Sequence, residues 1–527
     1  MKNKLPLYKN YIMNLIFPAF VFGSITGILT SIFVTLFKFC AKYAVSFSHT
    51  MYDYLSTHVY LLPLVLALGL GVAFLIALIC KKEPNLRGGG IPASILAMRG
   101  ITPIRWLRNL IGALFLPLIS FCFGIPLGTE GPSVLIGTTV GKGSVSMLAT
   151  KHKAWNKYSM TGGASAGFSV ATGSPISGIM FAIEDVHGRI SPMIVMVATI
   201  SVFFSRITSE LLDKIAFLQT DIMLFPNLSK PIALEIKDIW IPLAVGIIVG
   251  IMAVLFLNYY RAIYALFNKV LKKLPHSIRI FIVIALVLCI GIISFDFIST
   301  GHHLTESLLY DGQRAIALLF AILLVRMTLS LCANCNAING GMFLPIMSLG
   351  AVLSSIIAKV VISLGVDSSY YTVIVMLGIT ACISSMMKTP LTAIFFAIEA
   401  LSCYENILFI IVASIFAFII TEIFRAKSIN DTIIERRETE IHGDRKMIKI
   451  DTYVAIKPGS FAIGKQIRDI FWPNGLQVLS VKRSENEADI NQYGENDLRQ
   501  GDIIHVRYAT ADPERTNDEL YAIIGNQ

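Results

Sequence analysis

Residues 175–184 read Pro-Ile-Ser-Gly-Ile-Met-Phe-Ala-Ile-Glu, and residues 390–399, which lie 215 residues later, read Pro-Leu-Thr-Ala-Ile-Phe-Phe-Ala-Ile-Glu. A second echo has nearly the same spacing. Residues 131–137 and 344–350 share a proline and a glycine at matching places, 213 residues apart. Two matches at nearly one spacing are typical of an internal duplication. The sequence therefore predicts a chain that contains two related halves.

The composition assigns most of the chain to a membrane. Of its 527 residues 55% are hydrophobic and 15% are charged, which is too apolar for an ordinary soluble protein. Residues 61–80, 239–260 and 327–358 contain no charged residue. Each stretch reaches the roughly 20 residues that a helix needs to cross a bilayer. We expect an all-α, multi-pass domain over residues 11–425, preceded by a short basic leader at residues 1–10.

The two halves are expected at about residues 11–215 and 235–425. Internal repeats of membrane transporters typically form a substrate site where they meet, often from helices that are broken inside the bilayer. Short apolar segments interrupted by glycine and proline occur at 88–92, 124–132, 173–175 and 340–345. Such residues also permit close helix packing and kinks, which is the alternative interpretation. Their occurrence in both halves favours a transport site.

The formal net charge of +10 does not indicate a nucleic-acid partner. Residues 446–527 carry ten basic and twelve acidic residues, so the excess of positive charge belongs to the membrane part. There the basic residues gather in short connections, as at Lys81-Lys82 and Lys269, which is typical of the positive-inside bias. We expect no nucleic acid as a partner.

Cysteine usage gives no metal site. Cys332 and Cys335 have the spacing of a metal or redox pair, but a zinc site needs two further ligands and the sequence offers no second pair. We therefore expect no metal and no cofactor.

Glu130 is the candidate at the centre of the site. It is the only charged residue between Arg108 and Lys142, within the run Gly-Thr-Glu-Gly-Pro of residues 128–132. A helix that starts inside a membrane directs unpaired N–H groups and about half a positive charge at its first residues, which suits an anion. The carboxylate can occupy such a site itself and leave it when protonated. The alternative is an acid at a helix end in an external loop.

A second acidic position is Glu184-Asp185, at the end of the uncharged stretch 159–183. These residues could be an entry point for protons or a solvated helix terminus, and position alone does not decide. Glu399 is the repeat mate of Glu184 and is interpreted as structural.

Three of these runs resemble signatures of the CLC family of chloride channels and proton-coupled chloride transporters, namely GSGIP, GREGP and GxFxP. They stand here at 88–92, 128–132 and 341–345, and the resemblance covers about residues 10–440. It implies an inverted-repeat fold with tilted, broken helices, in a homodimer. It also implies Glu130 as gate and proton acceptor and Asp185 as inner proton-transfer residue. The anion-binding residues that it implies are Gly89, Gly90, Ile91, Gly131, Met342, Phe343 and Asn430.

The chain departs from the family pattern at three places. Gly89 stands where the family has a serine, Thr129 where it has an arginine, and Asn430 where it has a tyrosine. An amide still donates a hydrogen bond to an anion but is smaller than a tyrosine. We expect selectivity or coupling looser than the norm of the family.

The C-terminal part is a different unit. After a charged linker at 426–446, residues 447–527 alternate short apolar runs with turns, which predicts strands at 453–456, 477–483 and 503–508 and a helix near 464–470. This unit resembles the C-terminal subdomain of RCK (regulator of potassium conductance) modules. The resemblance implies a small cytoplasmic α/β domain that dimerises and senses an unknown small ligand, or that acts as a passive clamp.

The functional prediction is a proton-coupled chloride antiporter of the cell membrane, with chloride, protons and membrane lipid as partners. The alternatives are a passive chloride channel or an exporter of another anion, such as fluoride or nitrate. An intramembrane protease would need two facing aspartates or an HExxH motif, and a potassium-channel subunit would need a TVGYG-like filter. The sequence does not provide these, so we expect no enzyme.

Overall fold

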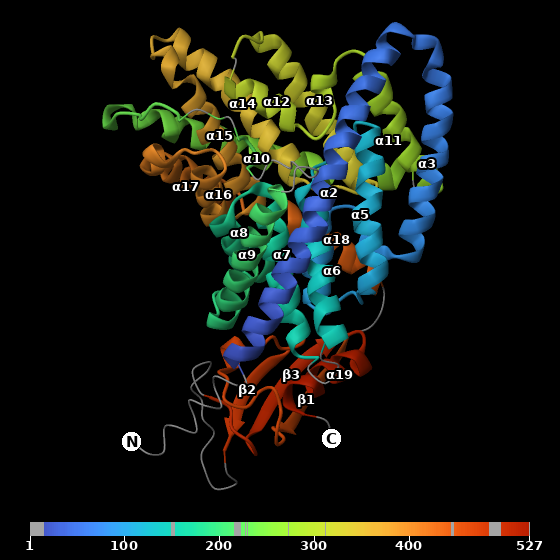
Figure 1. The fold of residues 1–527 in the computed structure, drawn as a ribbon, viewed down its shortest axis with the longest axis vertical. Coiled ribbons are helices and arrows are strands. Elements are labelled where there is room, and N and C mark those ends of the chain that lie inside the picture. The colour runs from blue at the N-terminus through green and yellow to red at the C-terminus, as the bar shows by residue number, and fades with distance from the viewer. Residues whose placement is uncertain are drawn as a thin grey trace.

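The computed structural model places a large helical domain above a small sheet domain (Figure 1). The basic leader at residues 1–10 lies outside the residues that the structure describes. Those residues are 15–148, 153–214, 223–226, 228, 230–271, 273–310, 312–443, 447–483 and 497–525.

The first half of the helical domain contains α2 to α9. Their bounds are α2 Phe17–Thr57, α3 Leu62–Lys82, α4 Gly90–Met98, α5 Trp106–Cys122, α6 Glu130–Leu148, α7 Trp155–Thr172, α8 Pro175–Phe181 and α9 Pro192–Asp213. The turn Ala182–His187 that follows α8 is a π-helix. Proline at the first position of α8 and α9 suits a helix start, where its missing N–H is not needed.

The second half contains α10 to α17. Their bounds are α10 Trp240–Val270, α11 His276–Gly291, α12 His302–Tyr310, α13 Ile316–Cys335, α14 Phe343–Ser363, α15 Tyr371–Met387, α16 Pro390–Glu399 and α17 Ile407–Ile423. The halves repeat their packing, since α6 packs on α7 as α14 packs on α15, and α2 on α9 as α10 on α17. The domain boundaries proposed from the sequence remain a prediction.

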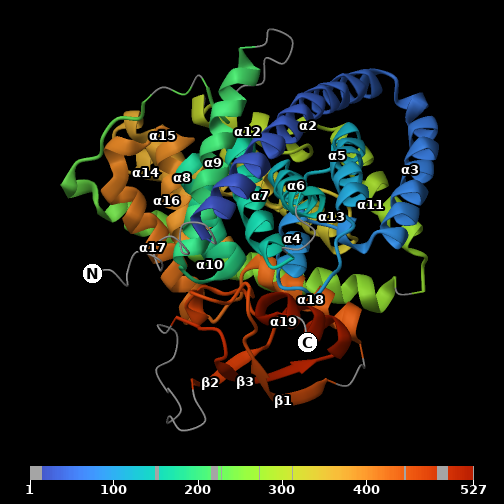
Figure 2. The same cartoon turned by 60° about the horizontal axis from the view of Figure 1, so that its bottom comes forward.

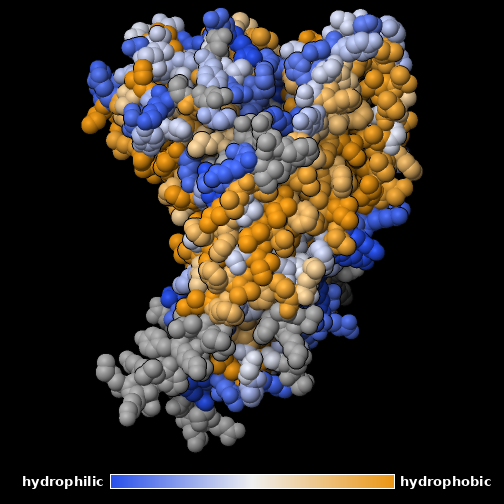
Figure 3. All heavy atoms as spheres, in the orientation of Figure 1, coloured by the Kyte–Doolittle hydropathy of each residue, from blue (hydrophilic) through white to orange (hydrophobic). Residues whose placement is uncertain are grey.

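In the described part of the chain, eight helices are long and apolar enough to cross a membrane. Their outward side chains form a broad apolar surface with hydrophilic residues toward its upper and lower limits (Figure 3). Because lipid is as apolar as these side chains, close packing has to hold the helices together. Glycines provide it between α6 and α7, where a Cβ on Gly137 would lie 1.9 Å from the Gly163 carbonyl oxygen, and one on Gly163 equally close to that of Gly137.

The segment predicted as a charged linker is largely helical. Helix α18, Ile429–His442, begins at the cap of Ser428, whose hydroxyl accepts from the Asp431 N–H. It packs against α4 and is anchored by Arg437, which donates to the carbonyl oxygens of Pro84 and Arg87. The charged run is therefore a helix that is hydrogen-bonded to the segment before α4.

The C-terminal domain contains an antiparallel sheet with strand order β1-β3-β2, namely β1 Ile448–Ala455, β2 Gln477–Lys482 and β3 Ile503–Thr510. The three predicted strands overlap these three, and two of them run one residue beyond the observed ends, at Ile456 and Arg483. The predicted helix near 464–470 is wrong, because only Ile467–Asp469 forms a 3-10 turn. Helix α19, Pro513–Ile524, was missed because its polar residues hide the apolar face that covers the sheet.

This domain docks against one end of the helical domain (Figure 2). The Tyr158 hydroxyl of α7 donates to the Asp469 carbonyl oxygen over 2.6 Å and accepts from the Phe471 N–H over 3.1 Å. Phe471 also stacks on His187, at 4.6 Å between ring centroids. The contact lies two residues beyond Asp185, so the domain bears on the turn that holds this acid.

Candidate functional site

Three helices begin at one place inside the domain: α4, α6 and α14. Gly128 and Gly341, one in each half, form a β-bridge with two N–H···O bonds of 2.7 Å. Glycine is required at this junction. A Cβ on Gly90 would lie 2.0 Å from the Gly131 carbonyl oxygen, and one on Gly131 would lie 2.7 Å from the Gly341 Cα. The first turns of three helices therefore direct their free N–H groups into one region.

A small cavity of about 10 Å³ lies among these helix starts. Such a volume is on the scale of one water-sized particle. The predicted anion-binding residues that line it are Gly89, Ile91, Gly131, Met342, Phe343 and Asn430. Gly90 is the predicted residue that does not line it, because its backbone is packed against Gly131. The three sequence motifs, which lie far apart in the chain, thus meet around one cavity.

Glu130 is fully buried and is the first residue of α6. This burial excludes the alternative of an acid in an external loop. Its Oε1 accepts from the Thr129 hydroxyl over 3.3 Å, and its Oε2 has no hydrogen-bond partner within the described residues. Both Oε2 and the Leu344 amide nitrogen lie next to Gly128. A Cβ added to this glycine would be 2.6 Å from Oε2 and 3.1 Å from the Leu344 nitrogen. The carboxyl group therefore lies where α6 and α14 both begin.

Asp185 lies in the π-helical turn after α8, and Asn430 lies in the first turn of α18. The Asn430 amide Nδ2 donates to Asp185 Oδ2 over 2.7 Å. Since Asn430 also lines the cavity, one side chain links the cavity to the second predicted acid.

Glu184 and Glu399 have structural roles that mirror each other. Glu184 accepts from the N–H groups of Leu391 and Thr392 at the start of α16, over 2.9 and 2.7 Å. Glu399 accepts from those of Ile176 and Ser177 at the start of α8, over 2.9 and 3.0 Å. Each acid thus caps the helix of the other half, and the role predicted for Asp185 remains a prediction.

Sequence reasoning missed Asn334 in α13. It lines the cavity and is 1% exposed, and its Nδ2 has no hydrogen-bond partner in the described part of the chain. It lies one residue before Cys335 and outside the three motifs, so no local signal distinguished it.

Taken together, these features define a polytopic membrane protein with an internal repeat and a polar site built from broken helices. Residues 71–422, more than half of the chain, match the family described as voltage gated chloride channel. The chain belongs to this family and is a multi-pass membrane protein. The C-terminal domain lies outside the match.

Individual relatives agree. Over 426 residues the chain is 24% identical to the H(+)/Cl(-) exchange transporter ClcA of Vibrio vulnificus (strain YJ016), covering 79% of this chain and 88% of that protein. It is 26% identical over 429 residues to the ClcA of Vibrio cholerae (strain ATCC 39541), covering 78% and 88%.

Solved structures confirm the predicted fold class. A slow cyanobacterial Cl-/H+ antiporter matches with a TM-score of 0.73 at 19% identity, over 80% of this chain and 98% of that chain. A CLC-type fluoride/proton antiporter matches with a TM-score of 0.65 at 18% identity, over 78% and 96%.

Proposed function

We propose that this protein exchanges a small anion, chloride first, for protons across the cell membrane. The observation that carries the proposal is the buried Glu130 carboxyl group at the junction of two helix starts, beside a cavity walled by three glycine-rich turns. The names of the relatives, which are proton–chloride exchangers, support it.

Glu130 acts as both gate and proton acceptor in this proposal. As a carboxylate it is attracted by the positive ends of α6 and α14, where it competes with an anion. When it binds a proton it loses this attraction, so the side chain leaves and an anion takes its place. One carboxyl group thereby links the two movements.

Asp185 serves as the inner proton-transfer residue. Its bond with Asn430 gives it a fixed orientation next to the anion cavity. Glu184 is not part of this path in the proposal, because its two carboxylate oxygens are occupied by the start of α16. We expect Asp185→Asn to slow proton movement while anion flux continues.

Purified protein in liposomes tests the exchange. An outward chloride gradient should drive protons uphill, and Glu130→Gln should abolish this proton movement while chloride still crosses. Glu405→Gln, which changes an exposed acid, is the matched control. If the parent protein conducts chloride without moving protons uphill, it is a passive channel and not an exchanger. If fluoride or nitrate crosses faster than chloride, the protein is an exporter of that other anion.

We also propose the cytoplasmic side for the C-terminal domain and a homodimer for the assembly. Basic connections such as Lys81-Lys82, Lys153 and Lys157 are expected on the cytoplasmic side, and the domain contacts Lys157 through Glu519 over 2.9 Å.

Apolar side chains exposed on the outer helices, such as Phe203 and Leu408, suit either lipid or a second copy. Cysteines introduced on α9 and α17 test this. Cross-linking between two copies indicates a dimer interface, and its absence indicates a surface that faces lipid.

The small ligand of the C-terminal domain is proposed to bind between the two domains. Two cavities of about 280 and 270 Å³ flank Arg515 and Glu519 there. Lys142 lines the second cavity and is half-buried, and its ammonium group has no hydrogen bond or ion pair within the described ranges. A phosphorylated molecule suits such a lysine. Binding of ATP as a probe should be lost in Lys142→Met and kept in Lys269→Met, which changes an exposed lysine of α10.

A further inference from the structure

We propose that Asn334 donates a hydrogen bond to the bound anion and supplies the side-chain donor that Gly89 lacks. The inference deepens the proposed function, since it concerns the same cavity. It starts from the Asn334 amide nitrogen, which is buried and has no hydrogen-bond partner within the described residues, while its residue lines the cavity. A buried donor without a partner has lost its hydrogen bond to water on folding, so such a group needs an explanation.

The orientation of the Asn334 amide follows from its neighbours. Arg436 of α18 donates through Nη1 to the Tyr260 hydroxyl over 2.7 Å. A guanidinium group cannot accept a hydrogen bond, so the hydroxyl proton of Tyr260 is free to point elsewhere. It donates to Asn334 Oδ1 over 3.4 Å.

This chain of donors fixes which end of the amide faces which way. With Oδ1 accepting from the Tyr260 hydroxyl, Nδ2 is left on the other side of the amide, and exchanging the two ends would lose the hydrogen bond that Tyr260 donates. The donor side of the amide is thereby available to the cavity. Arg436 and Tyr260 are positioning residues in this scheme, and Asn334 touches the anion.

The chemistry of the cavity fits this role. Gly89 lines the cavity without a hydroxyl, and Asn430 uses one of the two N–H groups of its amide on Asp185. Among the described residues that line the cavity, Asn334 is the one whose amide nitrogen has no partner, so both of its N–H groups are available to an incoming anion. A neutral donor also suits release, because a fixed cation would hold the ion too tightly.

Equilibrium binding of chloride to the purified full-length protein tests the inference, measured by calorimetry in a buffer free of chloride. Asn334→Leu keeps the size of the side chain and removes the donor. We expect it to weaken chloride binding about tenfold, as for the loss of one hydrogen bond to a charged group. Gly89→Ser in the Asn334→Leu background should restore part of the loss, because it returns a hydroxyl to the cavity.

Tyr260→Phe tests the positioning chain and serves if Asn334→Leu does not fold. It frees the amide to turn, so chloride binding should weaken about threefold or more. Tyr259→Phe is the matched control, since this neighbouring hydroxyl bonds Thr328 instead. Chloride binding in Asn334→Leu equal to that of the parent overturns the inference, with a trapped water as the partner of Nδ2. Failure of the parent to bind chloride, fluoride or nitrate would instead contradict the proposed function.

Discussion

At Gly89 the family has a serine, and the space around this glycine allows the serine to be restored. A Cβ at this position would have its nearest neighbour at 3.4 Å, the Pro92 Cδ, which is an ordinary van der Waals contact. A serine therefore fits. Gly90 is different, since a Cβ there would lie 2.0 Å from the Gly131 carbonyl oxygen.

We predict that Gly89→Ser folds and binds chloride about fivefold to tenfold more tightly, because it adds one donor to an anion in the cavity. Chloride binding and the ratio of chloride to fluoride flux measure the effect. Gly90→Ser is the control, and we expect it to lose transport through the displaced start of α6. An unchanged affinity in Gly89→Ser would show that the hydroxyl does not reach the ion.

Lys465 is a buried lysine of the C-terminal domain, 6% exposed, with its ammonium 3.8 Å from the Phe461 ring centroid. Burial lowers the pKa of Lys465 from 10.5 to about 8. In the unfolded chain the group keeps its ordinary pKa and binds a proton more readily. The stability of the folded domain therefore rises as the pH increases from about 8 to about 10.5.

Lys465→Met should remove this pH dependence and stabilise the domain by about 2 kcal/mol near pH 7. Thermal unfolding of the full-length protein at pH 7 and pH 10 measures it. Lys449→Met, on the exposed side of β1, should keep the dependence of the parent. The same rise between the two pH values in Lys465→Met would contradict the assignment.

At the scale of elements, the short helices α8 and α16 are held by acids from the opposite half. The prolines at their first positions define where they start, and Glu399 and Glu184 satisfy the N–H groups that follow. Carboxylates at helix starts also interact favourably with the helix dipole. Two equivalent sets of hydrogen bonds thus connect the two halves of the repeat.

We predict that Glu399→Ala lowers the free energy of unfolding by about 1–2 kcal/mol, the usual effect of losing a helix cap. Proton coupling should persist in the protein that remains folded. Glu405→Ala, six positions further and exposed, is the control for thermal unfolding in detergent. Loss of proton coupling without loss of stability would assign Glu399 to the proton path instead.

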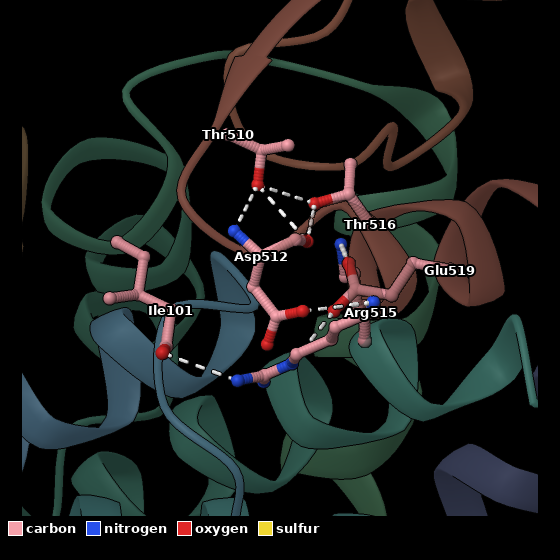
Figure 4. Close-up of polar contacts among 7 residues, drawn as sticks. Ile101, Thr510, Asp512, Arg515, Thr516 and Glu519 are labelled. Atoms are coloured by element: carbon pink, nitrogen blue, oxygen red, sulfur yellow. Dashed lines mark hydrogen bonds and ion pairs between the residues drawn. The ribbon is translucent and has the colours of Figure 1, made fainter. Parts of the chain in front are cut away.

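At the scale of the whole molecule, two of the contacts between the C-terminal domain and the helical domain lie close to the predicted site. Phe471 lies against Tyr158 and His187, and Arg515 of α19 donates to the Ile101 carbonyl oxygen just beyond α4 (Figure 4). Figure 4 also shows the cap of α19, where Thr510, Asp512 and Thr516 bond one another. One contact reaches the turn that holds Asp185, and the other reaches the segment that follows α4.

Phe471→Ala should weaken the docking of the domain by about 3 kcal/mol, the effect of emptying a buried aromatic site. Hydrogen exchange should then increase at residues 467–473 and in the turn that holds Asp185. Tyr453→Ala, on an exposed part of β1, should leave both unchanged. Equal exchange in Phe471→Ala and the parent would show that Arg515 and the other polar contacts hold the domain alone.

The sequence by itself determined the membrane class, the repeat, the three motifs and Glu130. Each depends on local patterns, such as apolar length, glycine spacing and an isolated charge. The tertiary structure decided the roles of Glu184 and Glu399, the helical form of the segment around Arg436, and the position of Asn334. These depend on partners far apart in the chain, as with Tyr260 and Asn334, which are separated by 74 positions. No local period or spacing records which buried polar groups will meet, because close packing of the two halves selects them.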